Sequence, residues 1–306
     1  MGERGAAPGG SGAPAWAYKL CCLAAALIWG SSFFIMKDTL GVLPPNCLLA
    51  VRFGGAALIL AAVMRRRVAA NLRAEVVARG LVMGALLFCA YCVQTVGLTD
   101  TTPGKNAFLT GVYCVLVPFL AWGLNRVRPS GYNVAAAVLC VAGIGLVSLS
   151  GDLTVRMGDA LTLLSAVFYA THIVVTARFS AGRDVMALTV WQFAGSAACA
   201  LVASLAFESW PAIEAWTPPV IGSMAYLTVM CTCVALLFQN IGTKHVDSSA
   251  AALLLSMESP SGVLFSVLFA GEVLTPRLVC GFALIFGAIV TSETQWRFLR
   301  RGAHRG

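Results

Sequence analysis

Long apolar stretches alternate with short polar connections along almost the whole chain. A helix that crosses a hydrocarbon core of ~30 Å needs roughly 20 apolar residues, because each residue rises about 1.5 Å. Ten stretches approach this length, the last being the shortest, and their connections leave no room for a soluble domain. The predicted spans cover residues 18–36, 47–64, 76–97, 104–124, 132–150, 158–179, 186–207, 219–241, 249–270 and 278–291.

The composition supports the same interpretation. Of the 306 residues, 59% are hydrophobic and 11% are charged, whereas a soluble domain has roughly 25% charged and about 45–50% apolar residues. Such a surplus of apolar surface aggregates unless lipid covers it. The first span lacks a small-residue cleavage site and is followed by nine more, so it is not a cleavable signal. We therefore predict an all-α polytopic membrane protein of ten transmembrane helices that needs the lipid bilayer as its solvent.

The basic residues are unevenly distributed between the two predicted faces. Of 21 Lys and Arg residues, 16 fall on the face that carries both chain ends, 4 fall on the opposite face, and Arg52 lies within a span. An excess of Lys and Arg marks the cytoplasmic side of a membrane protein. This pattern predicts a multi-pass protein of the cell (inner or plasma) membrane with both termini in the cytoplasm. Since topology accounts for the net charge of +8, no nucleic-acid partner is needed to explain it.

The two halves of the chain resemble each other. Gln94 begins QTVGLTDTTPGKNAFL and Gln239 begins QNIGTKHVDSSAAALL, 145 positions later, and Pro118 in span four matches Pro260 in span nine. A unit of five spans is odd, so the second copy enters the membrane from the opposite side. The predicted organisation is a disordered tail (1–16), a first repeat (17–150), a second repeat (157–293) and a basic cytoplasmic tail (294–306).

Inverted repeats are typical of alternating-access carriers, whose substrate site lies near the bilayer midplane between the repeats. Helix breaks at matching positions of both halves point to such a site. A proline within a helix leaves the carbonyl four residues earlier without its donor. Pro118 would free the carbonyl of Cys114, and Pro260 that of Ser256. The alternative is that both prolines are ordinary kinks needed for packing.

Several motifs resemble those of the drug/metabolite transporter superfamily. They are WGSSF at residues 29–33, Arg52 within AVRFGGAALIL, and the Gln-x-x-Gly motifs followed by Thr-Thr or Ser-Ser. The closing pattern, Pro260, Gly271-Glu272, Thr275-Pro276 and the glycines from Gly281 to Gly287, resembles the EamA branch. The resemblance covers residues 17–293. It implies two inverted five-helix EamA-like repeats around a cavity lined mainly by spans one, three, four, six, eight and nine.

The first copy departs from this pattern. Its stretch after Pro118 reads FLAWGLNRVRP and lacks the Gly-Glu pair. We therefore expect Gly271-Glu272 to shape the turn between spans nine and ten rather than to act on a substrate.

Two ionisable residues within the spans are candidates for function, because burying a charge in a membrane is costly. Glu258 lies ~15 Å into span nine, close to the midplane. It either binds a cationic group of the substrate or cycles a proton, or it is a structural partner, for example of Arg52. Arg52 lies ~9 Å from the outer end of span two. A structural ion pair or snorkelling to the interface is favoured there over substrate binding.

Polar side chains recur on one face of span six, where Ser165, Tyr169, His172 and Thr176 are spaced by four, three and four. The equivalent face of span one carries Ala25, Trp29, Ser32 and Met36, and the two faces would suit opposite walls of a cavity. His172 either takes part directly or is a satisfied packing residue. Groups that must point away from lipid complete the candidate set, either as site residues or as hydrogen bonds between helices: Tyr91, Gln94, Gln239 and Asn240.

The predicted function is secondary-active, alternating-access transport of small metabolites, with export of amino acids or related compounds favoured and proton or ion coupling possible. The chain lacks GxxxxGK[ST] and His-Glu-x-x-His, which disfavours ATP hydrolysis and metalloprotease chemistry. The Cys89–Cys92 pair has no second pair to complete a metal site, so no metal, cofactor or enzymatic activity is expected. The alternatives are a channel or a sensor on a transporter scaffold and, least favoured, an intramembrane enzyme. The pattern favours no particular oligomeric state.

Overall fold

The computed structural model describes residues 14–126, 128–149, 155–246 and 248–295. These residues form helices and connections, and they include ten helical segments long and apolar enough to cross a membrane. The predicted all-α fold with ten spans is confirmed. The predicted tails fall almost entirely outside the described residues, but the first helix already contains Ala15 and Trp16 and the last contains Thr294.

The first half of the chain contains α1 (Ala15–Thr39), α2 (Pro45–Val63), α3 (Arg65–Ala70), α4 (Ala74–Thr99), α5 (Pro103–Gly111), α6 (Tyr113–Asn125) and α7 (Gly131–Ser148). The second half contains α8 (Met157–Ser180), α9 (Val185–Phe207), η1 (Ile213–Ala215), α10 (Pro218–Ala225), η2 (Tyr226–Val234), α11 (Ala235–His245), α12 (Ser248–Leu255), α13 (Glu258–Phe269) and α14 (Pro276–Thr294). Span four is α5 with α6, span eight is α10 to α11, and span nine is α12 with α13.

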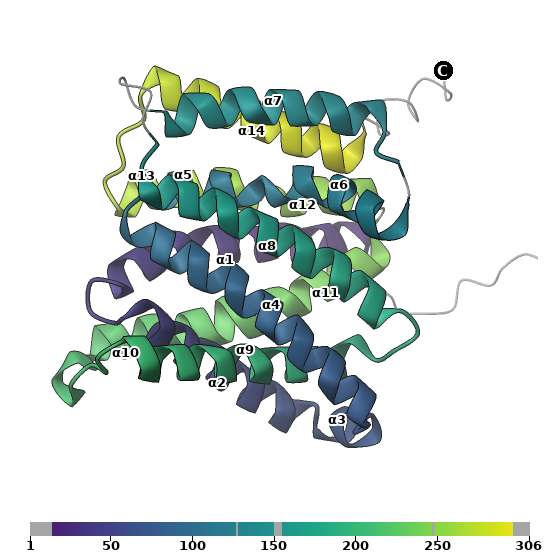
Figure 1. The fold of residues 1–306 in the computed structure, drawn as a ribbon, viewed down its shortest axis with the longest axis vertical. Helices are drawn as coiled ribbons and strands as arrows, with labels where there is room; N and C mark the ends of the chain where they lie inside the picture. The colour runs from purple at the N-terminus through teal and green to yellow at the C-terminus, as the bar shows by residue number, and fades with distance from the viewer. Residues whose placement is uncertain (1–13, 127, 150–154, 247, 296–306) are drawn as a thin grey trace, which may run out of the picture.

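The helices lie side by side in successive layers (Figure 1). From the top of this view, α7 and α14 form the first layer, the broken spans of α5–α6 and α12–α13 the second, and α1 with α8 the third. Below them lie α4 with α11, and then α9, α2 and α10. Each layer therefore pairs elements from the two halves of the chain.

The packing of the two halves is related by an approximate twofold symmetry. Helix α4 packs against α8 as α11 packs against α1, and α6 packs against α8 as α13 packs against α1. The pairs α2–α9, α5–α13 and α7–α14 join equivalent spans of the two halves. This exchange of partners is what two five-helix repeats of opposite orientation require, and it places both repeats around a shared centre.

Equivalent glycines allow equivalent helices to approach closely. A Cβ atom at Gly97 would collide with the Gly158 carbonyl on α8, and one at Gly242 would collide with Cys22 on α1. These two glycines are 145 positions apart, which is the shift predicted from the repeat. The close approach of α4 to α8 and of α11 to α1 therefore depends on the same residue type in both repeats.

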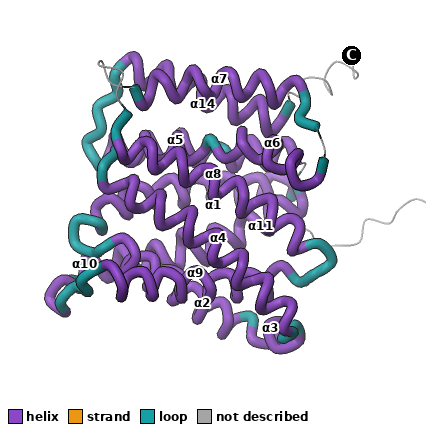
Figure 2. The backbone as a smooth tube through the Cα atoms, in the orientation of Figure 1, coloured by secondary structure: helices purple, strands orange, loops and turns teal. Residues whose placement is uncertain are grey.

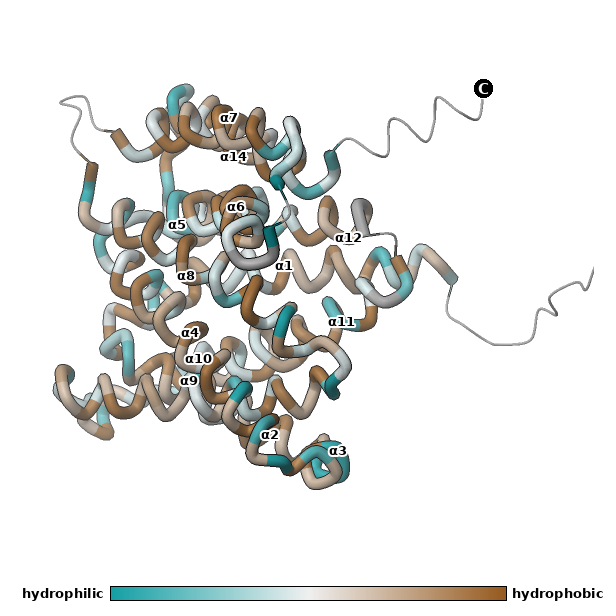
Figure 3. Tube along the Cα trace, turned by 45° about the vertical axis from the view of Figure 1, so that its right-hand side comes forward, coloured by the Kyte–Doolittle hydropathy of each residue, from teal (hydrophilic) through white to brown (hydrophobic). Residues whose placement is uncertain are grey.

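Connections gather at two opposite faces (Figure 2). We call the face where α1 begins and α14 ends the terminal face; it also carries α3 and the 181–184 connection. The far face carries the connections at 40–44, 100–102, 208–217 and 270–275. The helices between the two faces are mostly apolar, while polar residues are common on α3 and in the connections (Figure 3).

Spans four and nine are both interrupted near their centres. The first break is a turn at Val112, and the second is at Ser256 and Met257, immediately before Glu258. The break in span nine lies three to four residues before Pro260. The break in span four lies six residues before Pro118, which is inside α6. The assignment of the span-four break to Pro118 was therefore wrong. The residue directly before the break is Gly111, the last residue of α5.

The freed carbonyl in span four is satisfied by another helix. Ser292 Oγ on α14 donates to the Cys114 carbonyl at 3.1 Å, and Asn133 Nδ2 on α7 lies 3.3 Å from Ser292 Oγ. A hydroxyl from the second repeat thus replaces the backbone donor that Pro118 lacks, and α6 continues as a helix to Asn125.

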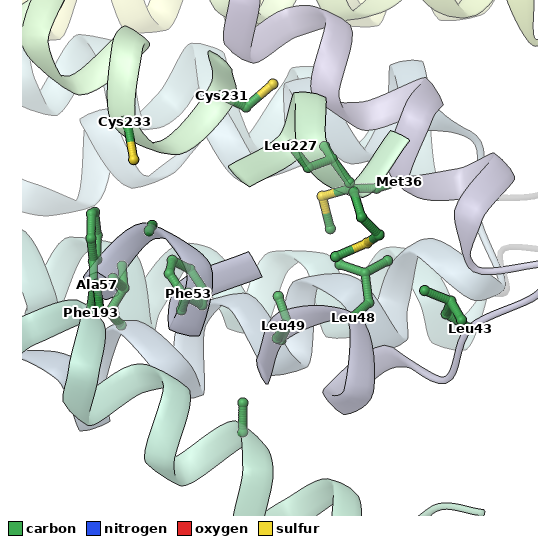
Figure 4. Packing of buried hydrophobic residues seen from close by; sticks show 14 of the residues in the cluster. Met36, Leu43, Leu48, Leu49, Phe53, Ala57, Phe193, Leu227, Cys231 and Cys233 are labelled. Carbon is green, nitrogen blue, oxygen red and sulfur yellow. The ribbon is translucent and has the colours of Figure 1, made fainter. Parts of the chain in front are cut away.

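The largest hydrophobic cluster joins α1, α2, α9 and η2. Figure 4 shows Met36 and Leu227 close to Leu48 and Leu49, with Phe53 and Phe193 further along α2 and α9. The segment η2 is a π-helix, and Thr232 Oγ1 donates to the Leu227 carbonyl five residues earlier at 2.8 Å. A π-helical run shifts the face that its side chains present and often occurs at functional sites. Here it borders a cavity.

Candidate functional site

A cavity of about 230 Å³ lies between the two repeats. Its walls come from α1, α2, α4, the broken span α5–α6, α8, α9, η2, α11 and the start of α13. Spans one, three, four, six, eight and nine all contribute, as the family resemblance implied, and spans two and seven add Phe53, Gln192 and Phe193. The cavity therefore occupies the place where the repeats meet.

Eight of the nine candidate site residues line this cavity. They are Trp29, Ser32, Tyr91, Gln94, Tyr169, His172, Gln239 and Glu258. Trp29 and Ser32 on α1 and Tyr169 and His172 on α8 belong to the two stripes for which opposite walls were expected. Asn240 is absent from the lining, and its Nδ2 lies 3.9 Å from Met186 Sδ on α9. It follows Gln239 on α11, so it points to a neighbouring helix instead.

A second cavity of about 310 Å³ extends the first toward the terminal face. Both cavities are lined by Trp29, Tyr113, Ile173, Gln239 and Glu258. The second cavity also reaches Glu293, which lies in the last turn of α14. The two spaces together lead from the centre of the protein toward the terminal face.

Glu258 is the first residue of α13, directly after the break in span nine. It is half-buried, and among the described residues it is the one Asp, Glu, Lys or Arg residue that lines the first cavity. A carboxylate at the start of a helix is stabilised by the peptide dipoles and by N–H groups that lack partners. The helix break therefore gives a negative charge a favourable position beside the cavity and leaves it accessible to a bound molecule.

Arg52 does not form the suggested ion pair with Glu258. Its side chain is 1% exposed; Nε donates to Thr232 Oγ1 at 2.8 Å and Nη1 lies 3.3 Å from Met36 Sδ. The guanidinium lies 5.1 Å from the centre of the Tyr91 ring. Aromatic faces attract cations, so a ring and a hydroxyl take the place of the expected carboxylate. Arg52 lies behind the cavity wall formed by Met36, Tyr91 and Thr232.

Several polar groups of the cavity wall are fixed by other helices. Tyr169 Oη donates to Gln94 Oε1 at 2.7 Å, and Gln94 Nε2 donates to Thr110 Oγ1 at 2.8 Å. Trp29 Nε1 donates to the Cys231 carbonyl in η2 at 2.8 Å. Gln94 thus joins three spans, as the alternative of hydrogen bonding between helices anticipated. These bonds hold the aromatic rings in place around the cavity.

Sequence reasoning missed several lining residues. Tyr113 is the first residue after the break in span four, as Glu258 is after the break in span nine. The shift of 145 between Gln94 and Gln239 pairs Tyr113 with Glu258, whereas the shift of 142 between Pro118 and Pro260 does not, so the repeat alone did not single out Tyr113. Gln192 on α9 also lines the cavity, although span seven was not among the spans expected to form most of the lining. Glu293 lies beyond the predicted end of span ten, because α14 continues to Thr294.

The EamA-like transporter family matches residues 16–149 and 156–293, once for each half of the chain. An uncharacterized transporter of Archaeoglobus fulgidus is 31% identical over 269 residues, covering 87% of this chain and 82% of that relative. The uncharacterized transporter YwfM of Bacillus subtilis is 27% identical over 293 residues, covering 90% of this chain and 93% of that protein.

A solved crystal structure shares the fold, with a TM-score of 0.64 and 20% identity over 93% of this chain and 99% of that chain. The two family matches correspond to the two sets of spans that pack with approximate twofold symmetry around the cavity. The chain therefore belongs to the EamA-like transporter family, within the drug/metabolite transporter superfamily.

Proposed function

We propose that this transporter is a secondary-active, alternating-access carrier that exports amino acids or related amphipathic amines. The observation that carries the proposal is the cavity between the repeats, which combines one carboxylate with aromatic rings. Inverted repeats place the substrate site at the repeat interface near the membrane midplane. The chain has no nucleotide-binding motif, so an ion or substrate gradient is the proposed energy source.

Each part of an amino acid has a suitable partner in this cavity. The ammonium group would bind Glu258, because an opposite charge in a partly desolvated site gives a strong, directional contact. The apolar part would lie against Trp29, Tyr91 and Tyr169, whose faces also attract cations. Arg52, on α2, lies behind Met36 and Thr232. Its positive charge would attract the substrate carboxylate to the end of the cavity near α2.

Proton coupling would follow from the same carboxylate. If Glu258 holds either the substrate ammonium or a proton, the two compete for one site, and a proton moving inward drives a substrate outward. Gln239 would assist binding at Glu258, because it lines both cavities. Its counterpart in the first repeat, Gln94, already bonds Tyr169 and Thr110.

Ligand-induced thermal shifts of the purified protein test the proposed substrate class. The panel pairs each amino acid with its decarboxylated amine and with its deaminated acid. We expect amino acids and amines to raise the unfolding temperature and the acids to leave it unchanged. Glu258→Gln removes a charged hydrogen bond and should weaken amine binding about tenfold, whereas Glu75→Gln, on the terminal face, should not.

Uptake into liposomes tests the coupling. In Glu258→Gln, uptake driven by a pH gradient should be lost, while exchange of substrate for substrate continues with a weaker apparent affinity. If Glu258→Gln keeps pH-driven uptake, Glu258 does not couple protons; if no compound of the panel stabilises the wild type, the proposed substrate class is wrong.

A further inference from the structure

The two faces of the protein differ in how the repeats are joined. Toward the terminal face the cavities continue to Glu293. Toward the far face the first cavity ends at Met36, Leu98 and Asn106, which are 3%, 0% and 0% exposed. The described conformation is therefore closed on the far side of the cavity and continues on the terminal side.

Carboxylates of one repeat cap helices of the other repeat on the far face. Asp100 follows α4, and its Oδ2 accepts the N–H of Gly158 at the start of α8 at 3.0 Å. Glu208 follows α9, and its two oxygens accept the N–H groups of Asn46 and Cys47 at the start of α2 at 2.8 and 2.9 Å. The first N–H groups of a helix have no partner within it, so each carboxylate satisfies groups of a helix in the opposite repeat.

Glu272 makes the third such connection. Its carboxylate accepts the N–H of Gly104 in α5 at 2.9 Å and hydroxyl hydrogen bonds from Thr102 and Ser266 at 2.5 Å. The Gly-Glu pair was expected to shape the turn between spans nine and ten. The structure gives Glu272 a further contact beyond this turn: it joins the start of span four in the first repeat to the end of span nine in the second.

Asp159 makes the fourth connection, through Lys105, which is next in the chain to a residue of the closed end of the cavity. It is 0% exposed, accepts a hydrogen bond from Thr101 at 2.5 Å and forms an ion pair with Lys105 Nζ at 3.0 Å. Lys105 precedes Asn106, which forms part of the closed end. The contact holds the start of α8 against the start of α5.

We infer that these four carboxylates, Asp100, Asp159, Glu208 and Glu272, form a clasp that keeps the far face closed and must release for the cavity to open there. The inference rests on the alternating access proposed above. All four connect one repeat with the other. On the terminal face, by contrast, Asp184 caps α9 and Ser130 caps α7 within their own repeat. There Glu75 and Arg183 form an exposed ion pair between the repeats.

Opening of the far face exchanges these contacts for water. The carboxylates become hydrated, whereas the closed state keeps them bonded to N–H groups, hydroxyls and Lys105. Since a conformational equilibrium responds to the difference in free energy between its two states, weakening the clasp shifts the population toward the state open on the far face. Asp159 and Glu272 are therefore positioning residues for transport without lining either cavity.

Sided labelling of Cys231 measures this shift without an added cysteine. Cys231 lines the first cavity, and a membrane-impermeant maleimide is applied to sealed vesicles of each orientation, defined by a tag after Gly306. Labelling is quantified on the Cys231 peptide by mass spectrometry. Asp159→Asn and Glu272→Gln keep the side-chain shape and remove the charge, and Asp184→Asn is the control, since it weakens a carboxylate cap that does not join the repeats.

We expect Asp159→Asn and Glu272→Gln to label about tenfold faster from the far face and more slowly from the terminal face, with Asp159→Glu closer to the wild type. General loosening would raise labelling from both faces and would overturn the inference, as would unchanged far-face labelling. If Asp159→Asn does not fold, Glu272→Gln decides alone. Labelling needs no substrate, so a negative panel in the binding screen would reject the proposed substrate class and leave this test intact.

Discussion

Arg52 shows how a charge can be held within the spans without a carboxylate. Its guanidinium lies over the rings of Tyr91 and Phe53, 5.1 and 5.7 Å from their centres, and donates to Thr232. A planar guanidinium suits this arrangement, because it can face a ring while Nε donates sideways. The ammonium of lysine is more strongly hydrated, and it has no planar group that can face a ring while a separate N–H donates sideways.

Arg52→Lys should therefore destabilise the protein although it conserves the charge. We expect a loss of about 2 kcal/mol, seen as a lower thermal unfolding midpoint in detergent. Arg79→Lys is the matched control, because Arg79 also lies over a ring, that of Phe179, but its side chain is 29% exposed and pairs with Glu75. Equal shifts of the unfolding midpoint in the two variants would show that the buried arrangement around Arg52 does not stabilise the protein.

At this scale the sequence predicted which residues reach the cavity better than it predicted their partners. Polar groups within spans must avoid lipid, so Glu258, His172 and Gln94 could be assigned to the interior. The depth of a residue along its span follows from counting, but its direction around the helix axis and the rotation of neighbouring helices do not. The suggested pairing of Arg52 with Glu258 failed for this reason.

At the scale of elements, the break in span four is separate from the proline that was expected to cause it. Pro118 removes one donor, and Ser292 supplies another, so the helix continues. The sequence could predict the lost hydrogen bond from the proline alone. It could not predict the replacement donor 178 positions away, nor the π-helical run of η2, whose residues carry no distinguishing pattern.

A double-mutant cycle tests the replacement donor. Ser292→Ala should cost about 1 kcal/mol by leaving the Cys114 carbonyl without a partner. Pro118→Ala restores a backbone N–H four residues after Cys114, so Ser292→Ala should cost less in that background. The measurement is the thermal or denaturant unfolding of the four proteins. Equal costs in both backgrounds would show that Ser292 does not compensate for the proline.

At the scale of the whole molecule, the two repeats pack symmetrically but are joined asymmetrically. The symmetric part could be predicted, because span length and repeat spacing are properties of the sequence. The clasp could not, because its hydrogen bonds join residues up to 170 positions apart, as between Thr102 and Glu272. Each of its four carboxylates is also an ordinary polar residue in a connection or first turn. The departure of the first copy from the Gly-Glu pattern was the one visible sign of asymmetry.

Symmetric packing of the repeats together with asymmetric contacts at the two faces suits the proposed carrier, which exposes one central site to each face in turn. Under the proposed alternating access, symmetry would give two related packings of the same repeats, and the differing contacts at the two faces would decide which packing is populated. A channel would need no such alternation, since both ends of its pore are open together.

Counterflow in liposomes tests this account most directly. Liposomes containing the purified protein are loaded with an unlabelled compound from the binding screen, and uptake of the same labelled compound is followed without an ion gradient. The account predicts uptake that saturates with external concentration, is accelerated by internal substrate, and is weakened in Glu258→Gln. Flux that rises linearly with concentration and ignores internal substrate would contradict it.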